Sequence, residues 1–283
     1  MTGTPDYGRR RHREDCRIEE RWIDHDGFRI FTKSWIPGRP RPGGVAPIVL
    51  CHDSLGSVDQ WRDFPVWLAQ ETGHPVYAYD RHGFGRSAAR SDRPGRAFIR
   101  EEGQRHIPAI CDHLSLDEII LCGHSVGGAM AMETASHHPS RCQAVITIAA
   151  QAFVEDKTLA GVREARRQFA TDPGLLDRLA RYHGEKARWV LHAWTETWLS
   201  ADFANWTLNE AIAAVQCPVL AIQGAADAYG TPAHAHRIAE AEKATALIIP
   251  EAGHFPHKNM PQRLIDEMAA FLVRLQPATN RHA

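Results

Sequence analysis

The chain has 283 residues, a length that fits a single α/β core with an optional insertion. Its hydrophobic fraction of 43% and charged fraction of 24% are typical of a globular protein, and a formal net charge of -1 gives no global field for nucleic acid or an anionic membrane. No apolar stretch reaches the roughly twenty residues of a membrane span, and the six cysteines form no C-x-x-C pair. We therefore expect a cytoplasmic protein, monomeric or homodimeric, with no nucleic-acid or membrane partner and no disulfide framework or zinc site.

The first predicted feature is a solvated, disordered tail over residues 1–16. Its basic run at 9–13 is followed by Glu14 and Asp15, and not by the apolar segment of a targeting signal. Residues 17–24 and 28–35 then predict a hairpin that turns at Asp26-Gly27.

Further along the chain, strand-like apolar runs alternate with helical patterns. The strand candidates are residues 47–51, 76–79, 119–122, 144–148, 219–222 and 246–249. The helix candidates lie near residues 60–70, 97–113, 126–137, 232–241 and 261–275. This alternation predicts an α/β fold with a mostly parallel central sheet of about eight strands and helices on both faces.

One long segment, residues 153–214, interrupts the alternation. It contains amphipathic helical patterns at 159–170 and 173–182, several tryptophans and no strand-like run. We expect a core formed by residues 17–152 and 215–276, a helical insertion over 153–214 and a C-terminal tail over 277–283.

Ser125 is the candidate nucleophile. It stands in the sequence Gly123-His124-Ser125-Val126-Gly127, after an apolar run and before a small-residue helix. Such a strand, sharp turn and helix exposes a serine hydroxyl, and glycines two residues to either side leave room for the turn.

An acid and a histidine follow downstream, each just past a predicted strand. Asp227 comes after the run that ends at Gly224, and His254 comes after the run that ends at Pro250. Because the carboxyl ends of parallel strands meet at one edge of a sheet, we expect the three side chains to converge there. A base oriented by a carboxylate can activate a serine for acyl transfer.

Together these motifs resemble the α/β-hydrolase family over nearly the whole chain. Besides the serine turn, His52-Asp53-Ser54-Leu55-Gly56 is similar to the family's oxyanion loop, and the stretch from Asp80 to Ser87 resembles its D-x-x-G-x-G-x-S turn. The resemblance implies an oxyanion hole formed by the backbone N–H groups of Ser54 and Val126. It also implies that residues 153–214 form a helical cap.

The cap and the histidine loop supply candidate substrate contacts, namely Trp194, Trp198 and Phe255. His52 is expected to organise its loop, and His124 to face away from the substrate. We interpret His234 and His236 as surface residues, and His257 as a loop residue that binds no metal.

Two features leave alternatives open. Asp53 replaces the glycine that usually follows the loop histidine, so its carboxylate must point away or be paired, for example with Arg86. Asp80, Glu155 and Asp156 also follow strands and compete with Asp227 as the acid, although we favour Asp227.

The resemblance implies a serine hydrolase that cleaves a small carboxylic ester, lactone or thioester through an acyl-enzyme. Alternatives within the fold are a C–C bond hydrolase of a vinylogous diketone, a peptidase for short N-terminal residues and a cofactor-free oxygenase or perhydrolase. An alternative from another class is a non-catalytic ligand-binding or receptor module. The glycine-rich runs complete neither G-x-G-x-x-G nor a P-loop, and we expect no cofactor and no metal.

Overall fold

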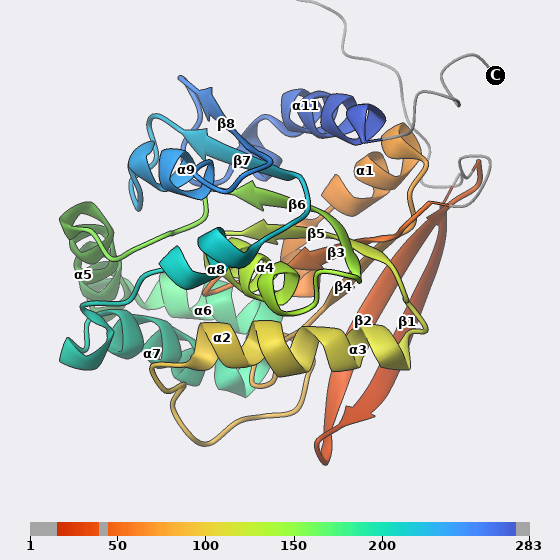
Figure 1. Ribbon diagram of the computed structural model, residues 1–283. Coiled ribbons are helices and arrows are strands. Elements are labelled where there is room, and N and C mark those ends of the chain that lie inside the picture. Colours follow the sequence, from red (N-terminus) through yellow and green to blue (C-terminus); the bar gives the residue numbers. More distant parts are fainter. Residues whose placement is uncertain (1–15, 40–44, 276–283) are drawn as a thin grey trace, which may run out of the picture.

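A computed structural model describes residues 16–39 and 45–275, and it contains one eight-stranded sheet (Figure 1). The strand order is β1-β2-β4-β3-β5-β6-β7-β8. The strands are β1 (Cys16–His25), β2 (Phe28–Pro37), β3 (Ile48–Cys51), β4 (Val76–Tyr79), β5 (Ile119–His124), β6 (Cys142–Ile148), β7 (Val219–Gly224) and β8 (Ala244–Ile249). The predicted tails, residues 1–16 and 277–283, lie outside the described residues except for Cys16.

The opening hairpin forms the antiparallel edge of the sheet. His25 pairs with Phe28 across a two-residue turn, in which Asp26 and Gly27 have φ values of 51° and 81°. Positive φ at both positions is the signature of the tight turn that matches the twist of a hairpin, and Asp-Gly supplies it at low cost. β2 joins β4 antiparallel, and all later pairs are parallel, which confirms the predicted mostly parallel sheet.

Helices cover both faces of the sheet. One face packs against α1 (Phe64–Thr72) and α11 (Pro261–Arg274), and the other packs against α4 (Val126–His137) and α9 (Ala233–Ile238) (Figure 1). Every residue of β5 is buried, as expected for a central parallel strand with helices on both sides.

Two predicted helices differ from the structure. Residues 60–70 do not form one helix, because a 3₁₀ turn (Val58–Trp61) comes first and α1 begins at Phe64 with Pro65 in its first turn. The predicted helix 97–113 divides into α2 (Phe98–Glu101), a π-helical turn η3 (Glu102–His106) and α3 (Ile107–His113).

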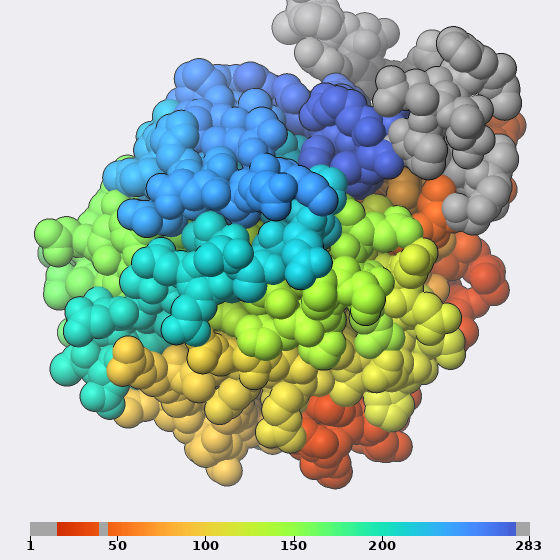
Figure 2. Space-filling model, in the orientation of Figure 1, coloured from red at the N-terminus to blue at the C-terminus, as the bar shows by residue number. Residues whose placement is uncertain are grey.

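The segment between β6 and β7 is helical, as its pattern predicts. Its helices are α5 (Asp156–Thr171), α6 (Pro173–His183), η4 (Gly184–Lys186), α7 (Ala187–Trp198), η5 (Ala201–Phe203) and α8 (Asn209–Ala214). Figure 2 shows the teal residues of this insertion beside the gold residues near 90–100, where Arg93 pairs with Glu196 and Arg100 with Glu210. None of the helices in the described ranges has the length and apolarity needed to cross a bilayer.

The strand order reverses next to β3. The chain passes from β3 outward to β4, and then returns to place β5 on the other side of β3. In open α/β sheets a ligand binds at such a switch point, outside the carboxyl ends of the strands. The loops after β3 and β5 contain Asp53 and Ser125, so the topology places both at this point.

Candidate active site

Ser125 occupies a strained turn between β5 and α4. Its φ of 55° and ψ of -127° are rare for a residue with a side chain. A Cβ atom on Gly123 would overlap the backbone of Gly127, and one on Gly127 would overlap the carbonyl of Cys51. The Ser125 N–H donates to the carbonyl of Ile148 at 2.8 Å, which ties the turn to β6. Both glycines are therefore required by close backbone contacts on either side of the serine.

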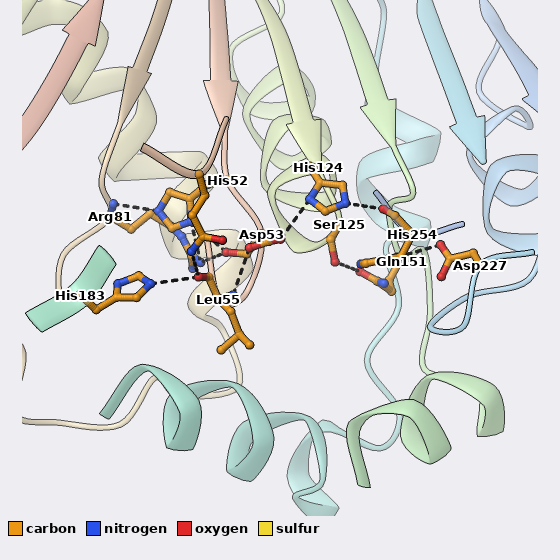
Figure 3. Close-up of polar contacts among 11 residues, drawn as sticks. His52, Asp53, Leu55, Arg81, His124, Ser125, Gln151, His183, Asp227 and His254 are labelled. Carbon is orange, nitrogen blue, oxygen red and sulfur yellow. Dashed lines mark hydrogen bonds and ion pairs between the residues drawn. The ribbon is translucent and has the colours of Figure 1, made fainter. Parts of the chain in front are cut away.

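Asp227 and His254 form a hydrogen-bonded pair. His254 Nδ1 lies 2.8 Å from Asp227 Oδ2, and Asp227 also accepts from Gln223 Nε2 at 2.7 Å and from the Tyr229 N–H at 2.7 Å (Figure 3). Burial raises the pKa of Asp227, but the bond and charge of His254 outweigh burial and hold that pKa below its ordinary value. An ionised Asp227 fixes the proton of His254 on Nδ1 and leaves Nε2 available as a base.

The hydroxyl of Ser125 donates to Gln151 Oε1 at 3.2 Å. Gln151 is buried and follows β6, which lies beside β5 in the sheet. Gln151 was not among the residues predicted from the sequence. Its position just past a strand end, the same signal that selected Asp227, could have identified it.

A cavity with about 450 Å³ of empty space contains these groups. Its lining consists of Asp53, Ser54, Leu55, Ser125, Gln151, Thr158, Val162, Trp194, Trp198, Tyr229, His254 and Phe255. The three aromatic residues selected from the sequence, Trp194, Trp198 and Phe255, are all in the lining, and Trp194 and Trp198 come from α7 of the insertion. Tyr229, which the sequence analysis missed, contacts both Trp194 and His254, with ring centroids 5.9 and 4.9 Å apart. A mostly apolar pocket with a few converging polar groups is typical of a small-molecule site.

Both residues selected for the oxyanion hole lie close to Ser125. Ser54 lines the cavity, and Val126 is the first residue of α4. An N–H group in the first turn of a helix has no partner within that helix, so Val126 can offer its amide to an anion.

Asp53 pairs with His124 and not with Arg86. Its Oδ2 lies 3.2 Å from His124 Nδ1, and its Oδ1 accepts from the Leu55 N–H at 3.1 Å. Burial raises the pKa of Asp53, but the hydrogen bond and charge of His124 more than offset burial and keep that pKa well below its ordinary value. Arg86 instead pairs with Glu20 at 2.8 Å and with Asp59 at 3.2 Å.

His124 connects the Asp53 loop to the histidine loop. Its Nε2 lies 2.7 Å from the carbonyl oxygen of His254, while its Nδ1 faces Asp53 (Figure 3). Both neighbours are acceptors, so a doubly protonated His124 would satisfy each of them. His124 does not line the cavity, and its side chain instead connects the loop of Asp53 with the loop of His254.

His52 and Arg81 organise the same loop. The Arg81 N–H donates to His52 Nε2 at 3.1 Å, which leaves Nδ1 of His52 to donate to the Asp53 carbonyl at 2.9 Å. Arg81 Nη2 donates to the same carbonyl at 2.7 Å. From the insertion, His183 accepts the Gly85 N–H at 2.9 Å and lies 3.0 Å from the Leu55 carbonyl.

Two of the three competing acids, Asp80 and Glu155, have other partners, and Asp156 is an exposed residue at the start of α5. Asp80 accepts from the N–H groups of Val58 and Arg86, both at 2.7 Å, and burial raises the pKa of Asp80 to about 6. Glu155 accepts from the Thr231 N–H at 2.7 Å and lies 3.0 Å from His234. Asp80 thus organises the turn that follows it, and Glu155 holds the chain after β7.

Two histidine interpretations from the sequence were wrong. His234 is fully buried, because it lies between Glu155 and the Ala152 N–H, which donates to its Nδ1 at 3.2 Å. His257 lies in the short helix α10 (Pro256–Asn259) and not in a loop, and it packs against Trp61 with ring centroids 4.9 Å apart. His236 is exposed, as expected.

A family model described as the alpha/beta hydrolase fold matches residues 46–188, just over half of the chain. The chain belongs to this family. The family assignment confirms the resemblance seen in the sequence, together with the expectation of an α/β-fold hydrolase.

The curated relatives that match this chain carry different activities in their names. It is 28% identical over 247 residues to the dihydrolipoyllysine-residue acetyltransferase component of an acetoin cleaving system from Pseudomonas putida, a match that covers 81% of this chain and 64% of that protein. It is 33% identical over 126 residues to a non-heme haloperoxidase from Rhodococcus erythropolis, covering 44% of this chain and 42% of that protein. The matches thus span less than two thirds of each relative.

Among solved structures, the enol-lactonase from Burkholderia xenovorans LB400 superposes with a TM-score of 0.68 at 18% identity. The superposition covers 89% of this chain and all of the lactonase chain. At this level of identity the match shows a shared fold.

Proposed function

We propose that this protein is a serine hydrolase that cleaves a small carboxylic ester, lactone or thioester. The observation that carries the proposal is the buried Asp227–His254 pair beside a serine in a strained, glycine-flanked turn. A base held in one tautomer beside a serine hydroxyl that faces the same cavity is the arrangement that acyl transfer requires.

In the first half of the reaction, His254 Nε2 takes the proton of Ser125 while Oγ bonds to the substrate carbonyl carbon. The N–H groups of Ser54 and Val126 stabilise the oxyanion that forms. The bond to the leaving oxygen or sulfur then breaks, and His254 delivers the proton to that atom. Asp227 stabilises the imidazolium that exists between these two transfers.

In the second half, water attacks the acyl carbon while His254 takes a proton from that water. The bond between the acyl carbon and Ser125 Oγ breaks, and the serine recovers its proton from His254. The products are the carboxylic acid and the free enzyme.

The Gln151 contact suggests a resting state of the site. The Ser125 hydroxyl donates to Gln151 Oε1 in this structure, so it must rotate toward His254 before the proton can transfer. Hydrogen bonds between catalytic groups are often long or misaligned without substrate and tighten only when substrate is bound.

The lining of the cavity supports a small, partly apolar substrate. Trp194 and Trp198 bring the insertion over the serine, and on this proposal residues 153–214 act as a cap that limits water access. The aromatic and aliphatic side chains around the serine, including Val162 and Phe255, offer apolar contacts to a short acyl chain or a lactone ring.

The test is labelling with a fluorophosphonate probe, read by intact mass, together with hydrolysis of short p-nitrophenyl esters. We expect one adduct on the wild type, no adduct on Ser125→Ala, and a loss of turnover of at least about a thousandfold in Ser125→Ala and in His254→Ala. The exposed His192→Ala serves as a matched control that keeps full activity.

Two outcomes would contradict the proposal. A folded wild type with neither adduct nor turnover would favour a ligand-binding module. Aerobic turnover that persists in Ser125→Ala would favour cofactor-free oxygen chemistry at His254.

A further inference from the structure

Two histidines and an aspartate lie together at the hairpin turn, outside the cavity that contains Ser125. His25 ends β1, Asp26 is the first turn residue, and His106 ends the π-helical turn η3. His25 Nε2 lies 2.7 Å from His106 Nδ1 and 3.6 Å from Asp26 Oδ2. One ligand atom from each residue lies within 4.8 Å of the others, and among the described residues this is the one group with such spacing.

The backbone fixes the positions of all three residues. Asp26 has its φ of 51° because the Asp-Gly turn closes the hairpin, and this orientation brings its carboxylate back toward His25. His106 is the last residue of the π-helical turn, and Gly103 in the same turn packs directly against Glu133 and the Met130 carbonyl of α4, where a side chain would not fit. Single π-helical turns are rare and occur frequently at functional sites.

The two imidazole rings meet in a geometry that is suited to a shared ion. Their planes are perpendicular, with centroids 5.1 Å apart, and the two facing nitrogens have only one hydrogen between them when both rings are neutral. His25 is buried, and burial lowers its pKa, so its imidazole is held in the neutral form that ligates metals.

We propose that His25 Nε2, Asp26 Oδ2 and His106 Nδ1 bind one divalent transition-metal ion, with Zn²⁺ as the best match. Two imidazoles and one carboxylate form a ligand set of borderline softness that zinc accepts, and water would complete a tetrahedral shell. Zinc–nitrogen bonds of about 2.0–2.1 Å separate two ligand nitrogens by about 3.3 Å, so the rings must move apart slightly on binding. The hydrogen between the rings must give way to the metal, so the imidazole that carries it takes the other tautomer, with the hydrogen on its second nitrogen.

One neighbouring charge competes for the carboxylate. Arg105 Nη2 lies 3.5 Å from Asp26 Oδ2, and its side chain is 68% exposed. An exposed arginine pair of this kind contributes little and can swing away when the carboxylate binds an ion.

The ion would join two parts of the chain that are 81 residues apart in sequence. Figure 1 shows the turn of the β1–β2 hairpin beside the α2–α3 segment, at the edge of the sheet. Because the site forms only in the folded protein, metal binding should stabilise the docking of the hairpin on this segment.

The test is zinc titration of chelator-treated full-length protein against a chromophoric competitor, with bound metal counted by elemental analysis. We expect one ion per chain, and a higher melting temperature when zinc is present. His106→Gln should weaken binding at least about tenfold. Asp26→Asn should also weaken it while keeping the turn, because asparagine tolerates positive φ.

His192→Gln is the control, because His192 forms an exposed histidine–glutamate pair with Glu196 that could bind metal nonspecifically. It should leave both zinc affinity and the zinc-dependent rise in melting temperature unchanged. Zinc binding by His106→Gln or Asp26→Asn that equals the wild type, or an equal loss in His192→Gln, would overturn the proposal. Ester hydrolysis, measured in parallel with chelator present, reports on Ser125 separately and should persist in all three variants.

Discussion

Asp53 places a carboxylate next to the loop whose Ser54 amide is proposed to bind a developing negative charge. The neighbouring His124 and the Leu55 N–H hold this carboxylate in place, at 3.2 and 3.1 Å. Both contacts fix the side chain of Asp53 by hydrogen bonding, so its orientation is set by the loop and its neighbours. We therefore expect the aspartate that stands at position 53 in place of glycine to be tolerated because His124 is its partner.

We expect Asp53→Asn to be tolerated and Asp53→Ala to be damaging. Asparagine can accept from the Leu55 N–H and donate to His124 Nδ1, so both contacts of the Asp53 side chain can be kept. Alanine leaves both groups without a partner and should cost about 3–5 kcal/mol of unfolding free energy. The measurements are urea unfolding and kcat/KM on a p-nitrophenyl ester. An Asp53→Asn variant as inactive as Asp53→Ala, though stable, would show that the negative charge itself is needed.

Gly127 illustrates a backbone requirement of the serine turn. Its missing side chain lets α4 contact the carbonyl of Cys51, and that carbonyl belongs to a central strand that cannot move aside. We expect Gly127→Ala to lower the unfolding free energy by at least about 2 kcal/mol and to abolish fluorophosphonate labelling. Gly95→Ala is the control, because a Cβ atom there meets open space and should change stability by less than about 1 kcal/mol. Equal stability of both variants would contradict the proposed close contact.

At the scale of elements, His183 connects the helical insertion to the loop beside the serine. It ends α6, accepts the Gly85 N–H and faces the carbonyl of Leu55, a residue that lines the cavity. Burial lowers the pKa of His183 to about 4. The neutral ring thus holds the insertion near the site, and protonation would remove its acceptor for the Gly85 N–H.

The sign of the pH effect follows from this lowered pKa. An unfolded histidine titrates near pH 6.5, so the stabilisation from neutral His183 is complete above that pH and declines as the pH falls toward 4. We expect the stability difference between wild type and His183→Ala to be largest at neutral pH, at about 2–4 kcal/mol, and to shrink by up to about 3 kcal/mol near pH 4. Urea unfolding of both proteins across this range measures it. A difference that does not change with pH would mean that His183 titrates normally.

The sequence predicted elements better than it predicted their ends and side-chain partners. Buried parallel strands such as β5 are continuous apolar runs, so their positions are visible without tertiary information. The π-helical turn and the close approach of Gly103 to α4 involve tertiary packing, which the local pattern does not contain. Likewise, His234 has the sequence context of a surface residue, and its burial involves Glu155, Phe153 and the Ala152 N–H, all far away in the sequence.

The residues proposed for catalysis could be predicted from the sequence, whereas those proposed for metal binding could not. Ser125, Asp227 and His254 follow strand ends, so the geometry of a parallel sheet alone brings them to one edge. His25 and His106 come from an edge hairpin and a helix, and no periodic pattern relates two positions so far apart. This is why the sequence predicted the hydrolase site and not the candidate metal site.

At the scale of the whole molecule, the two faces of the sheet form separate apolar cores that share one set of strands. Cysteines are present in both: Cys51 and Cys111 lie in the core beneath α4, and Cys122 lies in the core beneath α1 and α11. Since alternate residues of each strand point to opposite faces, loss of the central strands would open both cores together.

The six cysteines therefore offer a test of cooperative unfolding. All six lie within the described residues, are buried and form no disulfide there, and burial raises the pKa of Cys111 and of Cys142 to about 12, which suppresses the reactive thiolate. We expect a thiol reagent to modify almost none of them in the native protein and all six in concentrated guanidinium chloride. Because both cores depend on the same central strands, peptide mapping at intermediate denaturant should find thiols of both faces modified at one common midpoint. Earlier modification of Cys16 alone would show instead that β1 separates from the sheet before the rest of the molecule unfolds.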